Sequence, residues 1–280
     1  MTKTLGSVHQ EAIEQLKPCS DSARLDADLL LSFALDIPRT RFITQADAPV
    51  SEEQFDYIQD LLDQRKAGNP ISYITGTQGF WDLELFVNEH TLIPRPETEL
   101  LVEFALSIFP ASKQINVIDL GTGTGAIAIA IAKSRPNWQV MACEQSKDAL
   151  NVARKNAENY QLKNIELIKS DWFSSIDNQK SFDLIISNPP YIPEQDPHLQ
   201  QGDVQFEPIG GLSSGKDGLD DIRQIVKAAK DHLNEYGWLI VEHGYDQGDA
   251  VKALFQEHGY HTIQQGQDLS GHTRATYGQR

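Results

Sequence analysis

From residue 94 onward, short apolar segments alternate with segments of helical periodicity. This alternation predicts an α/β fold, in which a mostly parallel sheet carries helices on both faces. The last two segments are separated only by a loop, so we expect those strands to pair antiparallel. The seven candidate strands are 115–120, 138–143, 165–169, 182–187, 238–243, 261–265 and 273–277. One intervening helix is expected to bury Ile222, Ile225, Val226 and Ala229.

The first 70 residues show helical patterns and no strand pattern. Ser22 or Asp21 can begin one helix, and Ser51, followed by Glu53 and Gln54, can begin another. The apolar positions expected to face a core are Leu25, Leu29, Leu30 and Phe33 in the first helix and Phe55, Ile58, Leu61 and Leu62 in the second. We interpret residues 1–70 as a small all-α domain.

A turn-forming sequence, Gly68-Asn69-Pro70, ends the helical region. Residues 71–93 then alternate apolar and polar side chains, as strands do, around Gly76 and Gly79. We interpret 71–93 as a linker that carries a short β-hairpin, and 94–280 as the second domain.

The composition excludes several classes of protein. The 280 residues include 24 Lys and Arg against 40 Asp and Glu, a formal net charge of −16, so direct nucleic-acid binding is not expected. The two cysteines, Cys19 and Cys143, exclude a disulfide framework and are expected to be buried, reduced thiols. No segment approaches the roughly 18 consecutive apolar residues of a membrane span, and the N-terminus lacks an apolar signal region. We expect a cytoplasmic protein.

An apolar strand at 116–120 runs into a glycine-rich turn and then a helix. Gly121, Gly123 and Gly125 allow a tight turn that a ligand can approach closely, with the N-terminus of the next helix facing it. The spacing differs from the G-x-G-x-x-G pattern of dinucleotide-binding proteins. Taken alone, the segment is also compatible with a tight turn that binds nothing.

Acidic and aromatic residues follow the next two strands. Glu144 stands after the second strand, where a carboxylate can accept hydrogen bonds from both hydroxyls of a ribose. Asp171 follows the third strand and can accept a hydrogen bond from an exocyclic amine, while Trp172 can flank a purine. Alone, Glu144 is also compatible with a helix cap, and the Asp-Trp pair with a surface turn. The glycine turn favours the ligand-binding interpretation of Glu144.

The segment Asn188-Pro189-Pro190-Tyr191 follows the fourth strand. Prolines donate no backbone hydrogen bond and fix φ, so the carbonyls around them are free and rigidly directed. Together with the side-chain oxygen of Asn188, these carbonyls form a set of acceptors that can hold an NH₂ group. Tyr191 offers a flat face to a planar group. The segment therefore predicts a site for an amide or an aromatic amine.

These motifs together resemble a class I S-adenosylmethionine-dependent methyltransferase. Within that class, Leu92-Ile-Pro-Arg-Pro-Glu-Thr-Glu99 and Phe206-Glu-Pro208 are similar to the HemK/PrmC-type protein-(glutamine-N5) methyltransferases. The resemblance covers essentially the whole chain, and the first of these segments is the more specific. It implies a Rossmann-like domain, S-adenosyl-L-methionine as the cofactor, and class-1 peptide chain release factors as substrates, with a role in translation termination.

The resemblance also implies a role for each motif. The methionine part of the cofactor is held by Gly121, Thr122, Gly123, Thr124 and Gly125, the ribose by Glu144, and the adenine by Asp171 and Trp172. The catalytic segment is Asn188, Pro189, Pro190 and Tyr191, and Asn188 also touches the methionine end of the cofactor. The family more commonly has Asp where Glu144 stands. The helical domain is expected to help hold the protein substrate.

A glutamine amide is a poor nucleophile because its nitrogen lone pair is delocalised into the carbonyl. Acceptors at Asn188 and at the Pro189 carbonyl can orient the NH₂ group toward a methyl donor. A ribosomal-protein glutamine remains an alternative substrate, as does a nucleic-acid adenine, because adenine-N6 methyltransferases share Asn-Pro-Pro-Tyr. A cofactor-binding adaptor without catalysis is a third alternative. The histidines show no metal-binding pattern, so no metal is expected.

Overall fold

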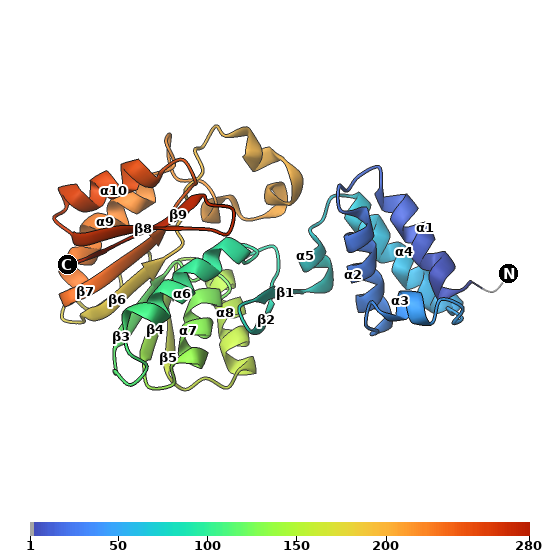
Figure 1. Cartoon of the computed structure of the whole chain (residues 1–280), viewed down its shortest axis with the longest axis horizontal. Coiled ribbons are helices and arrows are strands. Elements are labelled where there is room, and N and C mark those ends of the chain that lie inside the picture. The colour runs from blue at the N-terminus through green and yellow to red at the C-terminus, as the bar shows by residue number, and fades with distance from the viewer. Residues whose placement is uncertain (1–2) are drawn as a thin grey trace. The chain divides into compact units, whose positions relative to one another are not determined.

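The computed structural model describes residues 3–280, and the chain divides into two compact units, Met1–Gly76 and Thr77–Arg280. Figure 1 labels the elements of each unit along the chain. Each unit encloses hydrophobic core clusters of its own.

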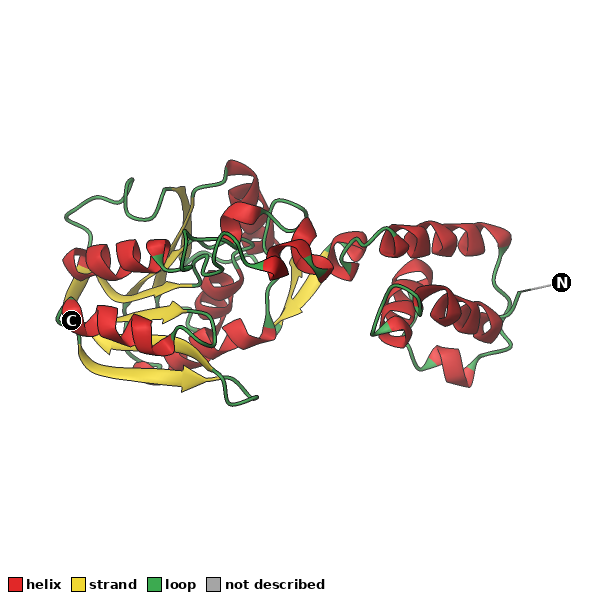
Figure 2. Ribbon diagram, turned by 90° about the horizontal axis from the view of Figure 1, so that it is seen from above, coloured by secondary structure: helices red, strands yellow, loops and turns green. Residues whose placement is uncertain are grey.

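The first unit is built from helices joined by loops, without strands among its named elements (Figure 2). Its helices are α1 (Leu5–Leu16), α2 (Ala23–Leu35), α3 (Arg41–Thr44), α4 (Glu52–Lys66) and α5 (Ile71–Thr75). Ser51 begins α4 in a capping box: its side chain accepts from the Gln54 N–H, and the Gln54 side chain accepts from the Ser51 N–H. Ile58, Leu61 and Leu62 of α4 are buried as expected, and the all-α N-terminal region is confirmed.

Helix α2 buries a different face from the one that we predicted. Leu25 and Phe33 are 46% and 42% exposed, whereas Ala27, Leu30 and Leu31 are fully buried. The prediction of Leu25 and Phe33 as core residues is wrong.

Asp26 explains the difference, because it lies on the buried face of α2. Its Oδ2 pairs with Arg65 Nε at 2.8 Å, and its Oδ1 accepts from the Ser22 hydroxyl at 2.9 Å. A charged side chain tolerates burial when it is paired in this way. Ser22, at the N-cap position of α2, makes no side-chain capping bond to the helix backbone.

Two further expectations are wrong. Ile71–Thr75 forms the short helix α5 instead of strand, and Ile71 and Ile74 pack against the helical core at the spacing of one helical turn. Cys19 is exposed in the turn after α1, whereas Cys143 is buried as predicted.

The predicted hairpin begins at Thr77. Strand β1 (Thr77–Phe80) pairs antiparallel with β2 (Leu83–Phe86). Asn156 of α8 (Lys147–Asn159) anchors the hairpin, because its Oδ1 accepts from the Phe86 N–H at 2.7 Å and its Nδ2 donates to the Phe86 carbonyl at 3.0 Å. The hairpin is thereby attached to the helical layer of the second unit.

A seven-stranded sheet organises the second unit, in the order β5-β4-β3-β6-β7-β9-β8. Neighbouring strands from β5 to β7 are parallel, and β9 is antiparallel to both β7 and β8, so the mostly parallel sheet and its antiparallel end are confirmed. The strands are β3 (Asn116–Leu120), β4 (Gln139–Glu144), β5 (Ile165–Lys169), β6 (Phe182–Ser187), β7 (Leu233–Glu242), β8 (His261–Gln267) and β9 (Thr273–Gln279). The main difference from the predicted strand bounds is that β7 begins at Leu233 instead of residue 238.

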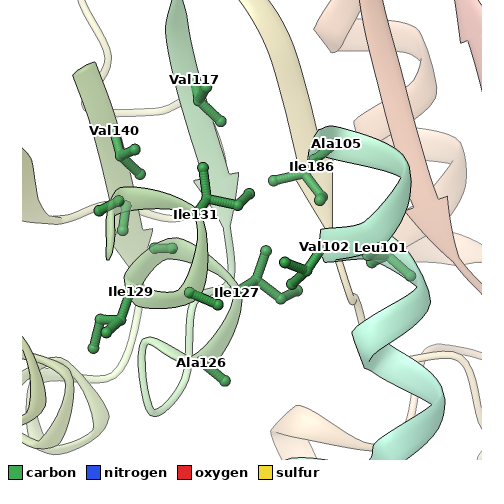
Figure 3. Close-up of a cluster of buried hydrophobic side chains, with 14 of the residues drawn as sticks. Leu101, Val102, Ala105, Val117, Ala126, Ile127, Ile129, Ile131, Val140 and Ile186 are labelled. Carbon is green, nitrogen blue, oxygen red and sulfur yellow. The ribbon is translucent and has the colours of Figure 1, made fainter. Parts of the chain in front are cut away.

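Two hydrophobic layers cover the sheet. The remaining helices are α6 (Glu99–Ile108), α7 (Ala126–Ser134), α9 (Asp220–His232) and α10 (Gly248–Glu257). Successive strand residues face opposite ways, so Val117 contributes to the core with α6 and α7, and Ile118 to the core with α9 and α10. Figure 3 shows the first of these cores, where Ile131 of α7 lies against the strands that carry Val117 and Val140. The four predicted core residues of α9 are all buried.

Short 3₁₀ segments connect the longer elements, at Pro96–Thr98, Pro197–Gln200, Gly202–Phe206 and Ile209–Gly211. None of the helices in the part of the chain that the structure describes is both long and apolar enough to cross a membrane. Within residues 3–280, no three His, Cys, Asp or Glu side chains are grouped in a way that could hold a metal ion.

Candidate active site

The order of the strands reverses at β3. The chain passes from β3 outward to β4 and β5 and then places β6 on the other side of β3. In doubly wound sheets, ligands bind beyond the carboxyl ends of the strands at such a point. The glycine turn follows β3 and Asn188 follows β6, so the two motifs lie at the same edge of neighbouring strands.

The turn after β3 has a left-handed backbone at its three glycines. The φ angles of Gly121, Gly123 and Gly125 are 71°, 55° and 85°. The N–H groups of Gly121 and Thr122 donate to the Cys143 carbonyl at 3.0 and 2.9 Å, which ties the turn to β4. Helix α7 begins directly after Gly125, so its N-terminus lies at the turn.

Asp119 supports this turn from within β3. Its Oδ2 accepts a hydrogen bond from the Thr122 hydroxyl at 2.6 Å, and both side chains are buried. Burial raises the pKa of Asp119 to about 7, although the hydrogen bond from Thr122 opposes the shift. The hydroxyl of Thr122 therefore makes its hydrogen bond within the protein, where it supports the turn.

Glu144 ends β4, and backbone groups hold its carboxylate. Oε2 accepts from the Gly123 N–H at 3.0 Å, and Oε1 accepts from the Ser146 N–H at 2.8 Å. Each carboxylate oxygen has a second lone pair, so both oxygens can still accept from a ligand hydroxyl.

Trp172 packs against the glycine turn. A Cβ atom placed on Gly121 would lie 3.1 Å from Trp172 Cζ3, which is a tight contact that glycine avoids. The indole N–H of Trp172 donates to Asp221 Oδ1 at 3.2 Å. The neighbouring Asp171 is exposed. The aromatic ring is therefore fixed between α9 and the turn.

A hydrogen bond to a neighbouring side chain holds the amide group of Asn188. Its Nδ2 donates to Thr98 Oγ1 at 3.0 Å. The side-chain oxygen of Asn188 is an acceptor with two lone pairs. Pro189 and Pro190 follow and are both buried.

Tyr191 directs its hydroxyl into the protein, where it donates to Glu242 Oε1 at 3.3 Å. Its carbonyl accepts from Gln247 Nε2 at 2.9 Å, and its N–H donates to the Leu212 carbonyl at 3.1 Å. Burial raises the pKa of Tyr191, and the nearby Glu242 raises it further, so the phenol stays protonated and remains a donor. The end of the Asn-Pro-Pro-Tyr segment is thus fixed by three different partners.

A cavity of about 440 Å³ joins these motifs. The predicted site residues on its wall are Gly121, Gly123, Glu144, Asp171, Trp172, Asn188 and Pro190. The predicted residues that are not on the wall are Thr122, Thr124, Gly125, Pro189 and Tyr191. The structure thus brings seven of the predicted positions together around one space, and the binding role of each residue stays a prediction.

Comparison with known proteins shows the family. Residues 7–76 match the PrmC N-terminal domain, and residues 97–203 match the Methyltransferase small domain. The release factor glutamine methyltransferase of Pseudomonas aeruginosa is 49% identical over 262 residues, which are 94% of each chain. The chain belongs to the release factor glutamine methyltransferase family. The Escherichia coli release factor glutamine methyltransferase is 44% identical over 269 residues, or 96% of each chain.

This member of the release factor glutamine methyltransferase family is an S-adenosyl-L-methionine-dependent enzyme, as the sequence resemblance implied. A methyltransferase from Pyrococcus furiosus shares the fold, with a TM-score of 0.53 and 21% identity over 79% of this chain and 96% of that one. The cavity fits such a cofactor chemically. It offers backbone without side chains at Gly121 and Gly123, a carboxylate at Glu144 and an aromatic ring at Trp172.

Other residues on the cavity wall were not predicted from the sequence. They are His90, Thr91, Leu92, Gln145, Ser146, Ala149, Ser170, Pro208, Gly210, Gly211, Asp221 and Gln224. Leu92 and Pro208 belong to the two segments that carry the family resemblance, so a signal for them was present. Asp221 and Gln224 lie on the polar side of α9, and which polar residue reaches the cavity depends on how the whole helix is placed.

Proposed function

We propose that this protein transfers the methyl group of S-adenosyl-L-methionine to the side-chain amide nitrogen of a glutamine in class-1 peptide chain release factors. Its high identity to named release factor glutamine methyltransferases supports this substrate. The observation that carries the proposal is that Asn188 opens onto the same cavity as the glycine turn and Glu144. An amide-binding group and a cofactor-binding edge thus share one space.

The cofactor is held by residues that follow the carboxyl ends of β3, β4 and β5. The turn from Gly121 to Gly125 holds the methionine end, Glu144 accepts from the ribose hydroxyls, and Asp171 and Trp172 flank the adenine. The bound cofactor supplies an electrophilic methyl group on a positively charged sulfur. The protein's part is to place an amide nitrogen in line with that group.

The substrate amide is held by Asn188 Oδ1, which accepts one N–H. The Pro189 carbonyl is the second acceptor that the sequence predicts, although Pro189 itself is buried and does not line the cavity. Acceptance of the N–H orients the nitrogen and keeps its lone-pair density toward the methyl group. The amide nitrogen would gain the methyl group as the carbon–sulfur bond breaks, and it would release one proton to solvent water. No protein nucleophile is required, and Cys143 is not one, because burial raises the pKa of its thiol to about 12.

The helical region, residues 1–70, binds the release factor in this proposal, and residues 71–93 connect it to the methyltransferase domain at 94–280. The acidic chain suits a protein partner with basic surface better than it suits nucleic acid. The reaction takes place in the cytoplasm, where translation terminates.

The test is a transfer assay with cofactor that carries a labelled methyl group. Purified class-1 release factor, ribosomal proteins and DNA are incubated separately with the full-length enzyme, and mass spectrometry locates the modified residue. We expect label on a glutamine side chain of the release factor. Label on ribosomal protein or DNA, with none on the release factor, would overturn the proposed substrate.

A further inference from the structure

A protein substrate has to lie over the edge of the sheet that carries the cavity, because its glutamine must enter that cavity. Specific protein complexes cover about 800 Å² of each partner, which is far more than one inserted side chain. The enzyme therefore needs further contact surface beside the cavity. Such a surface typically has apolar side chains at its centre and a charged rim.

Exposed apolar side chains are found in loops near the cavity. Among residues 77–280, all of which the structure describes, the exposed large apolar side chains are Trp81, Ile209, Tyr236, Tyr245 and Leu269. Ile209 is 60% exposed and lies between Pro208 and Gly210, which both line the cavity. Tyr245 follows the carboxyl end of β7, and Leu269 lies in the turn between β8 and β9.

The turn that carries Leu269 lies at the same end of β7 as Tyr245. Strand β9 runs antiparallel to β7, and Ala275 near its start pairs with Glu242, the last residue of β7. The Tyr245 ring also lies against His272 of the turn, with the ring centroids 5.7 Å apart. Leu269 and Tyr245 therefore belong to neighbouring parts of one surface, at the carboxyl ends of the parallel strands.

Asp268 holds the turn between β8 and β9 in a fixed shape. Its Oδ1 accepts from the N–H groups of Ser270 and His272, each at 2.9 Å. Its Oδ2 accepts from Arg274 Nε, also at 2.9 Å. Leu269 in this turn is nevertheless fully exposed. Because the backbone of the turn is already ordered, a partner that covers Leu269 loses little binding free energy to the ordering of a loop.

The backbone of Tyr191 joins this surface to the cavity. Its carbonyl accepts from the side chain of Gln247 at 2.9 Å, two residues after Tyr245. Its N–H donates to the Leu212 carbonyl at 3.1 Å, directly after the short turn that begins at Ile209. The residue before Tyr191 lines the cavity. The loops that carry the exposed side chains are thus attached to the wall of the active site.

We infer that Ile209, Tyr245 and Leu269 form a docking surface for the release factor beside the cavity. The inference rests on the proposed function, in which a glutamine of the release factor enters that cavity. The partner surface that fits is apolar near the glutamine and basic farther out, because Asp246 and Asp249 are exposed in the segment after Tyr245. The three side chains bind the intact protein substrate and take no part in methyl transfer.

The test uses the double variant Tyr245→Ser/Leu269→Ser in the full-length enzyme. Both side chains are exposed, so the variant should fold, and thermal unfolding checks this. With intact release factor as the substrate, we expect KM to rise by about tenfold or more. The kcat at saturating release factor and the cofactor Kd, measured by calorimetry, should stay within about twofold of the parent values. Ile209→Ser alone should raise KM by about threefold or more.

Tyr236→Ser is the matched control for the loss of Tyr245. The two tyrosines lie toward opposite ends of β7, and they are 66% and 62% exposed, so the same substitution removes a similar ring from each end of one strand. Tyr236 lies toward the amino end, away from the cavity. Its removal should leave the KM for release factor within about twofold of the parent value.

Three results would overturn the inference. They are a parent KM in the folded double variant, a loss in kcat with KM unchanged, and a rise in KM with Tyr236→Ser as large as that of the double variant. A parent KM in Ile209→Ser would exclude that residue from the docking surface. Failure of the proposed function is distinguishable, because the parent enzyme itself would then leave the release factor unmethylated.

Discussion

The Glu144 carboxylate and the Gly123 backbone N–H are joined by a 3.0 Å hydrogen bond across the ends of β4 and β3. With the Ser146 N–H on its other oxygen, the side chain both closes the glycine turn and presents its remaining lone pairs to the cavity. A change at Glu144 therefore affects the shape of the turn as well as the proposed contact with the cofactor.

We predict that Glu144→Ala raises the Kd for S-adenosyl-L-methionine by roughly ten- to a hundredfold, because it removes up to two charge-assisted hydrogen bonds to the ribose. Calorimetric titration of the folded variant measures this directly. An affinity equal to that of the parent would mean that the ribose is bound elsewhere.

Glu166→Ala is the matched control for Glu144→Ala. Glu166 lies on the neighbouring strand β5, its side chain is 61% exposed, and its partner is Lys180 at 3.6 Å. The substitution removes the same charge outside the cavity that holds Glu144, so the cofactor Kd should stay within about twofold of the parent value.

The second prediction compares two glycines of the same turn. Both have positive φ, so an alanine at either position should cost about 1–2 kcal/mol of unfolding free energy. At Gly121 the added Cβ would also press on Trp172 at 3.1 Å, whereas at Gly123 it would meet no atom within 4 Å. Gly121→Ala should therefore lower the unfolding midpoint in urea more than Gly123→Ala. Equal decreases in the unfolding midpoint would show that the Trp172 ring moves aside without loss of stability.

Much of the sheet could be predicted because its signals are local. The strands before Gly121 and before Asn188 are short apolar runs that end at glycine or proline, and β5 and β6 have the predicted bounds. The carboxyl ends of parallel strands meet at one edge, so the residues that follow them could be grouped before their positions were known.

The parts that could not be predicted depend on contacts between distant segments. The buried face of α2 contains Asp26, whose charged partner is Arg65, 39 positions later in the chain. Asn188 bonds to Thr98, and Tyr191 bonds to Glu242, and each pair comes from separate elements. No sequence spacing predicts these contacts. Periodicity describes which residues share a face but does not say which partner covers it.

The third prediction concerns pH and Asp119. Burial raises its pKa from 3.8 to about 7, so between these values the folded protein keeps a proton that the unfolded chain releases. The free energy of unfolding therefore falls as pH rises through this range. Asp119→Asn keeps the acceptor for Thr122 but has no proton to lose. Urea unfolding of both proteins at about pH 5 and about pH 8 should show the parent losing stability relative to the variant. Parallel pH curves would contradict the raised pKa.

The fourth prediction concerns the helical region. The second unit has its own core clusters, so a chain that begins at Thr77 should fold and bind cofactor. We expect this shortened enzyme to methylate intact release factor inefficiently, because it lacks the proposed substrate-binding region. The labelled-methyl assay measures the rate, and calorimetry with cofactor controls for folding. A full rate on intact release factor would exclude a substrate-binding role for the helices.

The last prediction concerns Asn188. Asn188→Ala should lower kcat by on the order of 10²-fold, the scale seen when one preorganised polar group is removed from a reacting centre. Cofactor affinity should fall less, because the glycine turn, Glu144 and Asp171 remain. Asn137→Ala is the control. Asn137 lies just before β4 and donates to the backbone carbonyls of Ala111 and Lys113 before β3, at the amino ends of the strands and so away from the cavity.

Asn188→Asp is the sharper form of this test. It keeps an oxygen that can accept from the substrate amide but adds a negative charge beside the positively charged sulfur of the cofactor. That charge stabilises the bound cofactor more than a transition state in which the positive charge disperses, so we expect measurable cofactor binding with depressed turnover. Single-turnover kinetics on release factor separate the two steps. If both Asn188 variants turn over at the parent rate, the amide is held by other groups, and the Asn188 mechanism is wrong even though the fold and the family are those of a methyltransferase.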